Sequence, residues 1–159
     1  MIEQIIPYVI FLAALGSGLI AGVFFAFSSF VMTALAKLPA KNGIAAMQSI
    51  NITVLNKSFL TVFMGTALAT ALLIVHSILN IENTNAFYLI TGSLFYLIGS
   101  FLVTILGNVP LNDALARVRS EEETSVPLWK NYLSKWSRWN HIRTLASLVA
   151  LAFFIFALS

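Results

Sequence analysis

Apolar residues dominate four stretches of the chain, and polar residues gather in the connections between them. The four apolar stretches cover residues 5–36, 52–79, 86–107 and 140–158. A helix needs about 20 apolar residues to cross the hydrocarbon core of a bilayer, and each stretch has about that length or more. The pattern predicts an all-α integral membrane protein in which residues 1–159 form one domain, a four-helix transmembrane bundle. The first residues carry no basic segment and no clear cleavage site, so we expect the first stretch to be retained as a helix.

The first connection predicts a short helix on the membrane surface. Within residues 37–51, apolar side chains recur at helical spacing, namely Ile44, Met47 and Ile50. Polar residues occupy positions between them, which is typical of a helix that lies in the membrane interface. We therefore expect an interfacial helix between the first two membrane helices.

The third connection, residues 108–139, begins near a proline and ends with an aromatic, basic segment. We expect Pro110 to break or kink the third helix, because proline lacks an N–H and clashes with the preceding turn. From Pro127 onward, apolar and aromatic residues recur at helical spacing among lysines and an arginine: Trp129, Tyr132, Leu133, Trp136 and Trp139 (or Asn140). This pattern indicates an amphipathic interfacial helix with an aromatic belt, which continues into the fourth membrane helix.

Composition and charge support a membrane protein and orient it. Hydrophobic residues make up 59% of the 159 residues and charged residues only 9%, whereas soluble domains carry about 25% charged residues. The net charge of +3 does not indicate a nucleic-acid partner, because in a membrane protein the placement of positive charges matters more than their sum. All nine lysines and arginines lie in or beside the first and third connections. The positive-inside rule makes residues 37–51 and 108–139 cytoplasmic and both termini external, most simply in a bacterial inner membrane.

The segment that leads into the fourth membrane helix carries polar residues on one helical face. Trp136, Asn140, Arg143 and Ser147 follow at spacings of four, three and four residues. An arginine at the mouth of a membrane helix is costly unless it reaches the interface or meets a partner inside the protein. The sequence leaves both arrangements of Arg143 open.

The predicted topology brings polar side chains from three parts of the chain to the cytoplasmic end of the bundle. They are Asn51, Asn56, Lys57, Asn108, Asn112, Trp136, Asn140, His141 and Arg143. Polar groups that face a bundle interior are expensive, which favours a ligand site. In the alternative, the asparagines cap helix ends and Arg143 extends to a lipid phosphate.

Several kinds of chemistry find no support in the sequence. The chain has no cysteine, no Glu-x-x-His pair for a di-iron site and no glycine-rich phosphate loop after a strand. A single axial haem ligand, His141, stays open. The remaining polar groups suit a planar organic molecule that is oxygen-rich or anionic. Arg143 would pair with a phenolate or carboxylate, amides would bond carbonyls, and tryptophans would stack.

Five motifs carry a family resemblance over nearly the whole chain. They are GLIAGVFFAFSSFVM at residues 18–32, Asn51 with the following Asn56-Lys57-Ser58-Phe59, Gly65-Thr66, Asn108-Val-Pro-Leu-Asn112, and Trp136-Ser-Arg-Trp-Asn140-His-Ile-Arg143. With these motifs the chain resembles a bacterial and fungal family of small membrane proteins, long catalogued as a domain of unknown function, that includes the anthrone oxygenases. The Asn-x-Pro-x-Asn and Trp-x-x-x-Asn-x-x-Arg elements are its most specific parts.

The resemblance implies a four-helix membrane bundle whose polar motifs meet at one end. For the characterised members it implies oxidation of an anthrone to an anthraquinone by molecular oxygen, with no added cofactor and no metal. The positions that it points to are Asn108, Asn112, Trp136, Asn140 and Arg143.

Two hypotheses follow from these observations. In the first, the protein is a membrane oxygenase that acts on a small aromatic, quinol-like molecule; Arg143, Asn140 and Asn108 are catalytic, and the substrate-binding residues are Trp136, Asn112, Asn51 and Asn56. In the second, it is a non-catalytic binding or assembly protein. The small residues Gly18 and Gly22 would then form a homo-oligomer or dock a partner helix, and Arg143 with the tryptophans would hold anionic lipid.

Overall fold

The computed structural model describes residues 2–159, with side chains from Gln4 onward, and contains no strand within that range. Four helical spans are long and apolar enough to cross a membrane: Gln4–Ala36, Lys57–Leu79, Ala86–Ala116 and Glu123–Phe156. The protein is therefore an all-α integral membrane protein, as the hydrophobic pattern predicted.

The spans are built from α-helices joined by short π-helical segments. The first span comprises α1 (Ile2–Ala26), the π-helical η1 (Phe27–Val31) and α2 (Met32–Ala36), and α3 (Ala40–Thr53) follows it. The second span is α4 (Lys57–Leu79). The third comprises α5 (Ala86–Leu94), the π-helical η2 (Phe95–Leu102) and η3 (Thr104–Asn108), and α6 (Val109–Ala116). The fourth comprises the 3₁₀ turn η4 (Glu123–Ser125) and α7 (Val126–Phe156).

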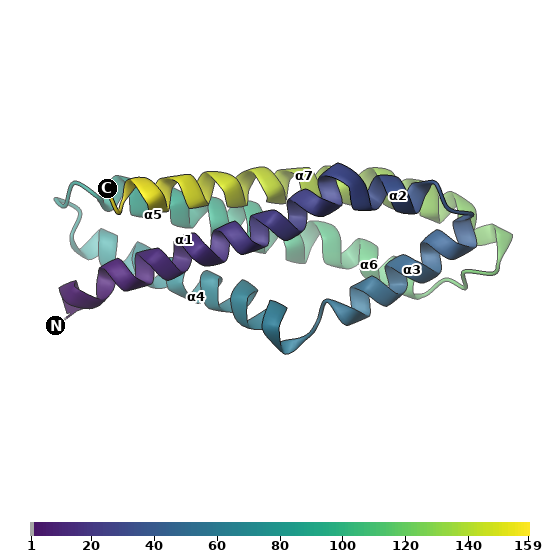
Figure 1. Cartoon of the computed structure of the whole chain (residues 1–159), viewed down its shortest axis with the longest axis horizontal. Coiled ribbons are helices and arrows are strands. Elements are labelled where there is room, and N and C mark those ends of the chain that lie inside the picture. The colour runs from purple at the N-terminus through teal and green to yellow at the C-terminus, as the bar shows by residue number, and fades with distance from the viewer. Residues whose placement is uncertain (1) are drawn as a thin grey trace.

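The bundle is elongated, with both termini at one end (Figure 1). The helix α7 lies along α1 for most of its length, and α4 and α5 complete the bundle near the termini. The helices α2, α3 and α6 and the start of α7 form the opposite end, where the basic residues lie. Which end faces the cytoplasm stays a prediction from the charge pattern.

The interior consists of two separate hydrophobic clusters. The first lies between the long helices and includes Phe24, Phe63, Tyr96 and Phe154. The second lies at the basic end and consists of Met32, Leu35, Ile44, Met47, Leu115, Trp129, Tyr132 and Trp136.

The aromatic residues of α7 belong to the second cluster. The ring centroids of Trp129 and Tyr132 lie 5.6 Å apart, and those of Tyr132 and Trp136 lie 6.1 Å apart, in stacked arrangements. Because these three rings are buried in the protein, they do not form the lipid-facing belt that the sequence suggested, whereas Trp139 is exposed. A position of α3 and of the start of α7 at the membrane surface stays a prediction.

Two helix boundaries differ from the sequence-based expectation. The second membrane helix begins at Lys57 rather than residue 52, because the Asn56 side chain caps it and accepts the Phe59 N–H at 3.0 Å. The third does not end at 107. Pro110 lies in the first turn of α6, where a missing N–H is tolerated, and the helical path continues to Ala116.

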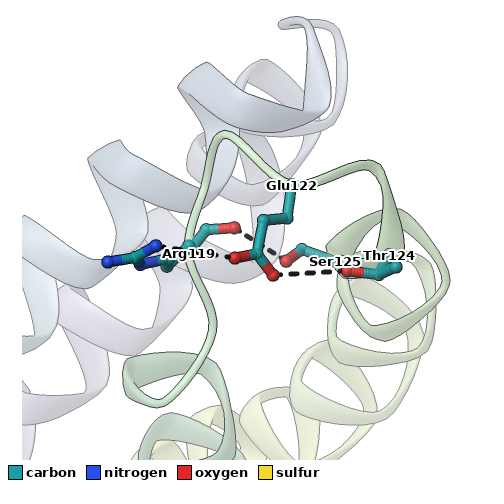
Figure 2. A network of polar contacts seen from close by, with 4 residues as sticks. All are labelled: Arg119, Glu122, Thr124 and Ser125. Atoms are coloured by element: carbon teal, nitrogen blue, oxygen red, sulfur yellow. Dashed lines mark hydrogen bonds and ion pairs between the residues drawn. The ribbon is translucent and has the colours of Figure 1, made fainter.

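A short loop reverses the chain between α6 and α7 (Figure 2). The Ser125 hydroxyl donates to the Arg119 carbonyl at 2.7 Å, and the Thr124 hydroxyl donates to the Glu122 carboxylate at 3.4 Å. Arg119 also pairs with Glu122 at 4.0 Å, but an exposed ion pair contributes little to stability. The bond from the buried Ser125 therefore ties the start of α7 to the loop.

The close approach of α3 to α7 gives a prediction for Gly43→Ala. A Cβ at Gly43 would lie 2.8 Å from the Trp129 ring and 3.0 Å from the Leu35 carbonyl oxygen. We expect the variant to be destabilised by about 1–3 kcal/mol, the usual cost of overpacking, seen as a lower Tm in detergent. Gly22→Ala is the control, because a Cβ at Gly22 meets nothing within 4 Å. Equal Tm values for the two variants would contradict the close packing of α3 on α7.

Candidate functional site

A cavity of about 390 Å³ lies between the two hydrophobic clusters, a size typical of small-molecule sites. Much of its wall is aromatic, formed by Phe24, Phe27, Phe59, Phe63 and Phe101. Its polar lining comes from four parts of the chain and consists of Asn51, Thr104, Asn112, Asp113, Trp136 and Arg143. We call it the Arg143 cavity, since this residue is its most unusual group.

Arg143 faces the bundle interior, with 5% of its surface exposed. Its guanidinium donates to Thr104 Oγ1 at 3.2 Å and to Asn140 Oδ1 at 2.7 Å, and its Nε has no hydrogen-bond partner. Both acceptors are neutral. No carboxylate pairs with it among the side chains from Gln4 onward, where the single ion pair joins Arg119 and Glu122. A buried cation without an anionic partner is costly, so this guanidinium is ready to receive an anion from a ligand.

Two aromatic rings partly compensate the buried charge. The guanidinium carbon of Arg143 lies 4.0 Å from the ring centroid of Phe24 and 5.1 Å from that of Trp136. The face of an aromatic ring attracts a cation, and the attraction strengthens when water is excluded. The rings therefore hold Arg143 at the cavity wall.

Asn140 accepts a hydrogen bond from Arg143 but does not itself line the cavity. Its amide nitrogen donates to the Phe24 carbonyl and to Ser28 Oγ, both at 2.7 Å, while its oxygen accepts from Arg143. Both N–H donors and the oxygen acceptor of this amide therefore have hydrogen-bond partners within the protein. Ser28 belongs to the π-helical η1, a type of irregularity that is frequent at functional sites.

A second group of hydrogen bonds fixes the edge of the cavity nearest α3. Asn112 Oδ1 accepts from the Tyr132 hydroxyl and from Trp136 Nε1, both at 2.8 Å. Asn51 donates to the Tyr132 oxygen at 3.4 Å. Three helices, α3, α6 and α7, are thereby tied together beside the cavity. Asn51, Asn112 and Trp136 line the cavity, and Tyr132 supports them from outside it.

The other sequence-predicted residues lie outside the cavity lining. Asn108 is buried and donates to the Trp136 carbonyl at 3.2 Å, while its own oxygen has no partner. Asn56 is exposed and caps α4. His141 is exposed on the other side of α7, with Nδ1 2.9 Å from Ser28 Oγ. The structure therefore brings together four of the seven predicted site residues as cavity lining, namely Arg143, Trp136, Asn112 and Asn51.

Sequence reasoning missed Thr104 and Asp113. Thr104 precedes Asn108 by four residues, so a helical-face argument applied to Asn108 finds it. Asp113 follows Asn112 directly but was assigned to a solvated connection, because the third helix was expected to end at 107. The continuation of the helix through Pro110 is what places Asp113 on the cavity wall.

A second cavity of about 360 Å³ lies near the termini. Its polar lining consists of His76, Ser77, Asn80, Asn83 and Asn85, and the remaining lining is apolar. No lysine, arginine, aspartate or glutamate lines it, among the side chains that the structure describes. Its chemistry offers no fixed charge to an anionic ligand.

Comparison with known proteins identifies the family. Residues 54–153, from the end of α3 to near the end of α7, match the family model described as anthrone oxygenase. The match includes Asn112, Trp136 and Arg143 and confirms the resemblance drawn from the sequence motifs. The helices α1 and α3, which supply Phe24 and Asn51 to the cavity, precede the matched region. No curated protein and no solved structure matches the chain.

The shared acceptor at Asn112 gives a second prediction. Asn112→Ala removes the partner of two donors at once, and leaving buried donors unsatisfied costs about 1–3 kcal/mol. Because one of these donors is the Tyr132 hydroxyl, the effects of Asn112→Ala and Tyr132→Phe on unfolding free energy should not add. We expect a coupling of about 0.5–3 kcal/mol in a double-mutant cycle measured in detergent.

The matched control pairs Asn112→Ala with Asn80→Ala at the opposite end of the bundle, where the two effects should add. Additive effects of Asn112→Ala and Tyr132→Phe would show that the two side chains do not interact.

Proposed function

We propose an oxygenase function for this chain, which belongs to the anthrone oxygenase family. The substrate is a small, planar aromatic molecule of the anthrone or quinol type, the oxidant is molecular oxygen, and no added cofactor takes part. The observation that carries the proposal is the buried guanidinium of Arg143, which has no anionic partner and lines a cavity with aromatic walls.

The cavity suits such a substrate in shape and chemistry. Phenylalanine rings from several helices offer faces and edges to a flat aromatic molecule, and such contacts add to the burial of apolar surface. The oxygen of the substrate would lie at Arg143, whose unpartnered Nε and terminal nitrogens supply charged donors. Asn51 and Asn112 lie on the same lining and would fix the orientation of the molecule.

The proposed reaction converts an anthrone and O2 into an anthraquinone and water. Loss of a proton from the ring carbon opposite the carbonyl gives a phenolate, whose electron-rich carbon reduces O2 and forms a C–O bond to it. The resulting hydroperoxide loses its remaining hydrogen from that carbon as its O–O bond breaks. One oxygen atom becomes the new carbonyl and the other leaves as water, so atoms and electrons balance.

Arg143 has the central role in this scheme. Negative charge develops on the substrate oxygen when the proton leaves, and a preorganised cation in a water-poor site stabilises such charge strongly. Asn140 and Thr104 hold the guanidinium in place and would act through it. Asn108 would act at greater distance, since it bonds the backbone carbonyl of Trp136.

The alternative, a non-catalytic lipid-binding or assembly protein, has less support. Arg143 is buried rather than extended to the membrane surface, so a headgroup would have to enter the cavity to reach it. Of the two small residues expected to form an interface, Gly18 already packs against Leu151 of the same chain.

The proposal predicts that Arg143→Lys and Arg143→Ala both lose activity. Lysine keeps a positive charge but cannot reproduce the planar set of donors. We expect kcat to fall by about 10²–10³-fold in each variant, as for removal of one oxyanion donor in other enzymes. The measurement is oxygen uptake together with anthraquinone absorbance, using purified protein in lipid nanodiscs and an anthrone as substrate.

Arg138→Lys is the control for this prediction, because Arg138 lies on the same helix with its side chain exposed. Circular dichroism establishes that each variant keeps its helix content. Full activity in both Arg143 variants would refute the proposed mechanism.

A further inference from the structure

A carboxylate lies at the opening of the Arg143 cavity. Asp113 on α6 lines the cavity and is also exposed, so it lies where the cavity meets the surface of the protein. It directly follows Asn112, whose oxygen is fixed by Tyr132 and Trp136. The backbone that carries Asp113 is therefore held in place relative to α7.

Asp113 and Arg143 are the charged residues of the cavity lining among the side chains from Gln4 onward. The helices α1, α3 and α4 and the π-helical η1 contribute neutral residues to the lining. No ion pair within 4.0 Å joins Asp113 to Arg143, because the guanidinium bonds Thr104 and Asn140 instead. A cation and a carboxylate thus line one cavity without forming an ion pair with each other.

The other charged groups on the neighbouring elements do not form ion pairs with Asp113 in the part of the chain with described side chains. Arg117, the residue just after α6, is exposed, and so are Lys41 on α3 and Lys57 at the start of α4. From α7, the Tyr132 hydroxyl donates to Asn112, and η3 offers neutral residues. None of these cations forms an ion pair with Asp113 in the part of the chain with described side chains.

We propose that Asp113 is the general base of the reaction, an inference that rests on the proposed oxygenase function. The C–H bond opposite the substrate oxygen breaks, and the proton passes to a carboxylate oxygen of Asp113. The electron pair moves through the ring to the substrate oxygen, which becomes an oxyanion beside Arg143. O2 is the oxidant of the following step, as in the proposed reaction, and the exposed carboxyl returns its proton to water.

This assignment also orients the substrate. The oxygen end enters first and lies at the buried guanidinium, while the reacting carbon stays near the opening. A general base must come within hydrogen-bond reach of the proton that it removes, so a flat molecule whose oxygen lies at Arg143 would have to span the cavity to bring its reacting carbon to Asp113.

The test compares Asp113→Asn and Asp113→Glu with wild type over a range of pH, using an anthrone as substrate in nanodiscs. At neutral pH we expect Asp113→Asn to lower kcat by about 10²–10⁴-fold, the usual contribution of general base catalysis, and Asp113→Glu to keep more of the activity. Because the anthrone ionises in solution as pH rises, the defect of Asp113→Asn should shrink by about tenfold per pH unit. Glu123→Gln, an exposed carboxylate at the same end of the bundle, is the control.

A second measurement separates this inference from the proposed function. Without oxygen, wild type should bind the anthrone and develop the absorbance of its phenolate, whereas Asp113→Asn should bind it in the neutral form. Phenolate formation in both proteins, or an equal loss of kcat at every pH, would overturn the role of Asp113 and leave the oxygenase proposal intact. Absence of both binding and oxygen uptake in wild type would overturn both.

Discussion

The burial of one guanidinium is the constraint on which the arrangement of the basic end depends. Arg143 has 5% of its surface exposed, bonds two neutral side chains and lies against two aromatic rings. These contacts come from three elements: Thr104 from η3, Phe24 from α1, and Asn140 and Trp136 from α7 itself. Because a buried cation needs compensation, the positions of these elements are coupled. The compensation is incomplete, since no carboxylate among the described side chains pairs with the guanidinium and its Nε has no acceptor, and the proposed function places the substrate oxygen here.

The two hydrophobic clusters explain why a cavity lies beside this residue. One cluster fills the space between the long membrane helices, and the other joins α2, α3, α6 and α7 at the basic end. The chain turns sharply between α3 and α4, as Figure 1 shows, so the two clusters do not merge there. Asn112 supports the boundary by binding Tyr132 and Trp136 together. Packing and polar bonding thus preserve a space with aromatic walls between the two clusters.

The hydrophobic pattern was sufficient to predict the four-helix architecture, because long apolar runs have few alternatives to crossing a membrane. It also placed Arg143 and the amides at one end. It did not give the rotation of each helix about its axis, which decides whether a residue lines the cavity, supports it or caps a helix, as Asn56 does. Asp113 was missed because a tolerated proline lets the third helix continue beyond its apolar run, and Thr104 was missed because the rotation of this helix was not known. The Trp129 ring was expected to face lipid, because an amphipathic pattern does not distinguish a lipid-facing stripe from a core-facing one.

The central claim is that the Arg143 cavity binds an aromatic molecule through its oxygen. The most direct test is a high-resolution experimental structure of the protein in nanodiscs with a bound anthraquinone, the product of the proposed reaction. The account predicts a flat ligand among the phenylalanine rings, with one carbonyl oxygen within hydrogen-bond distance of the Arg143 guanidinium and the opposite carbonyl toward Asp113. An Arg143 side chain turned out to a lipid phosphate, with the ligand elsewhere or absent from the cavity, would contradict it.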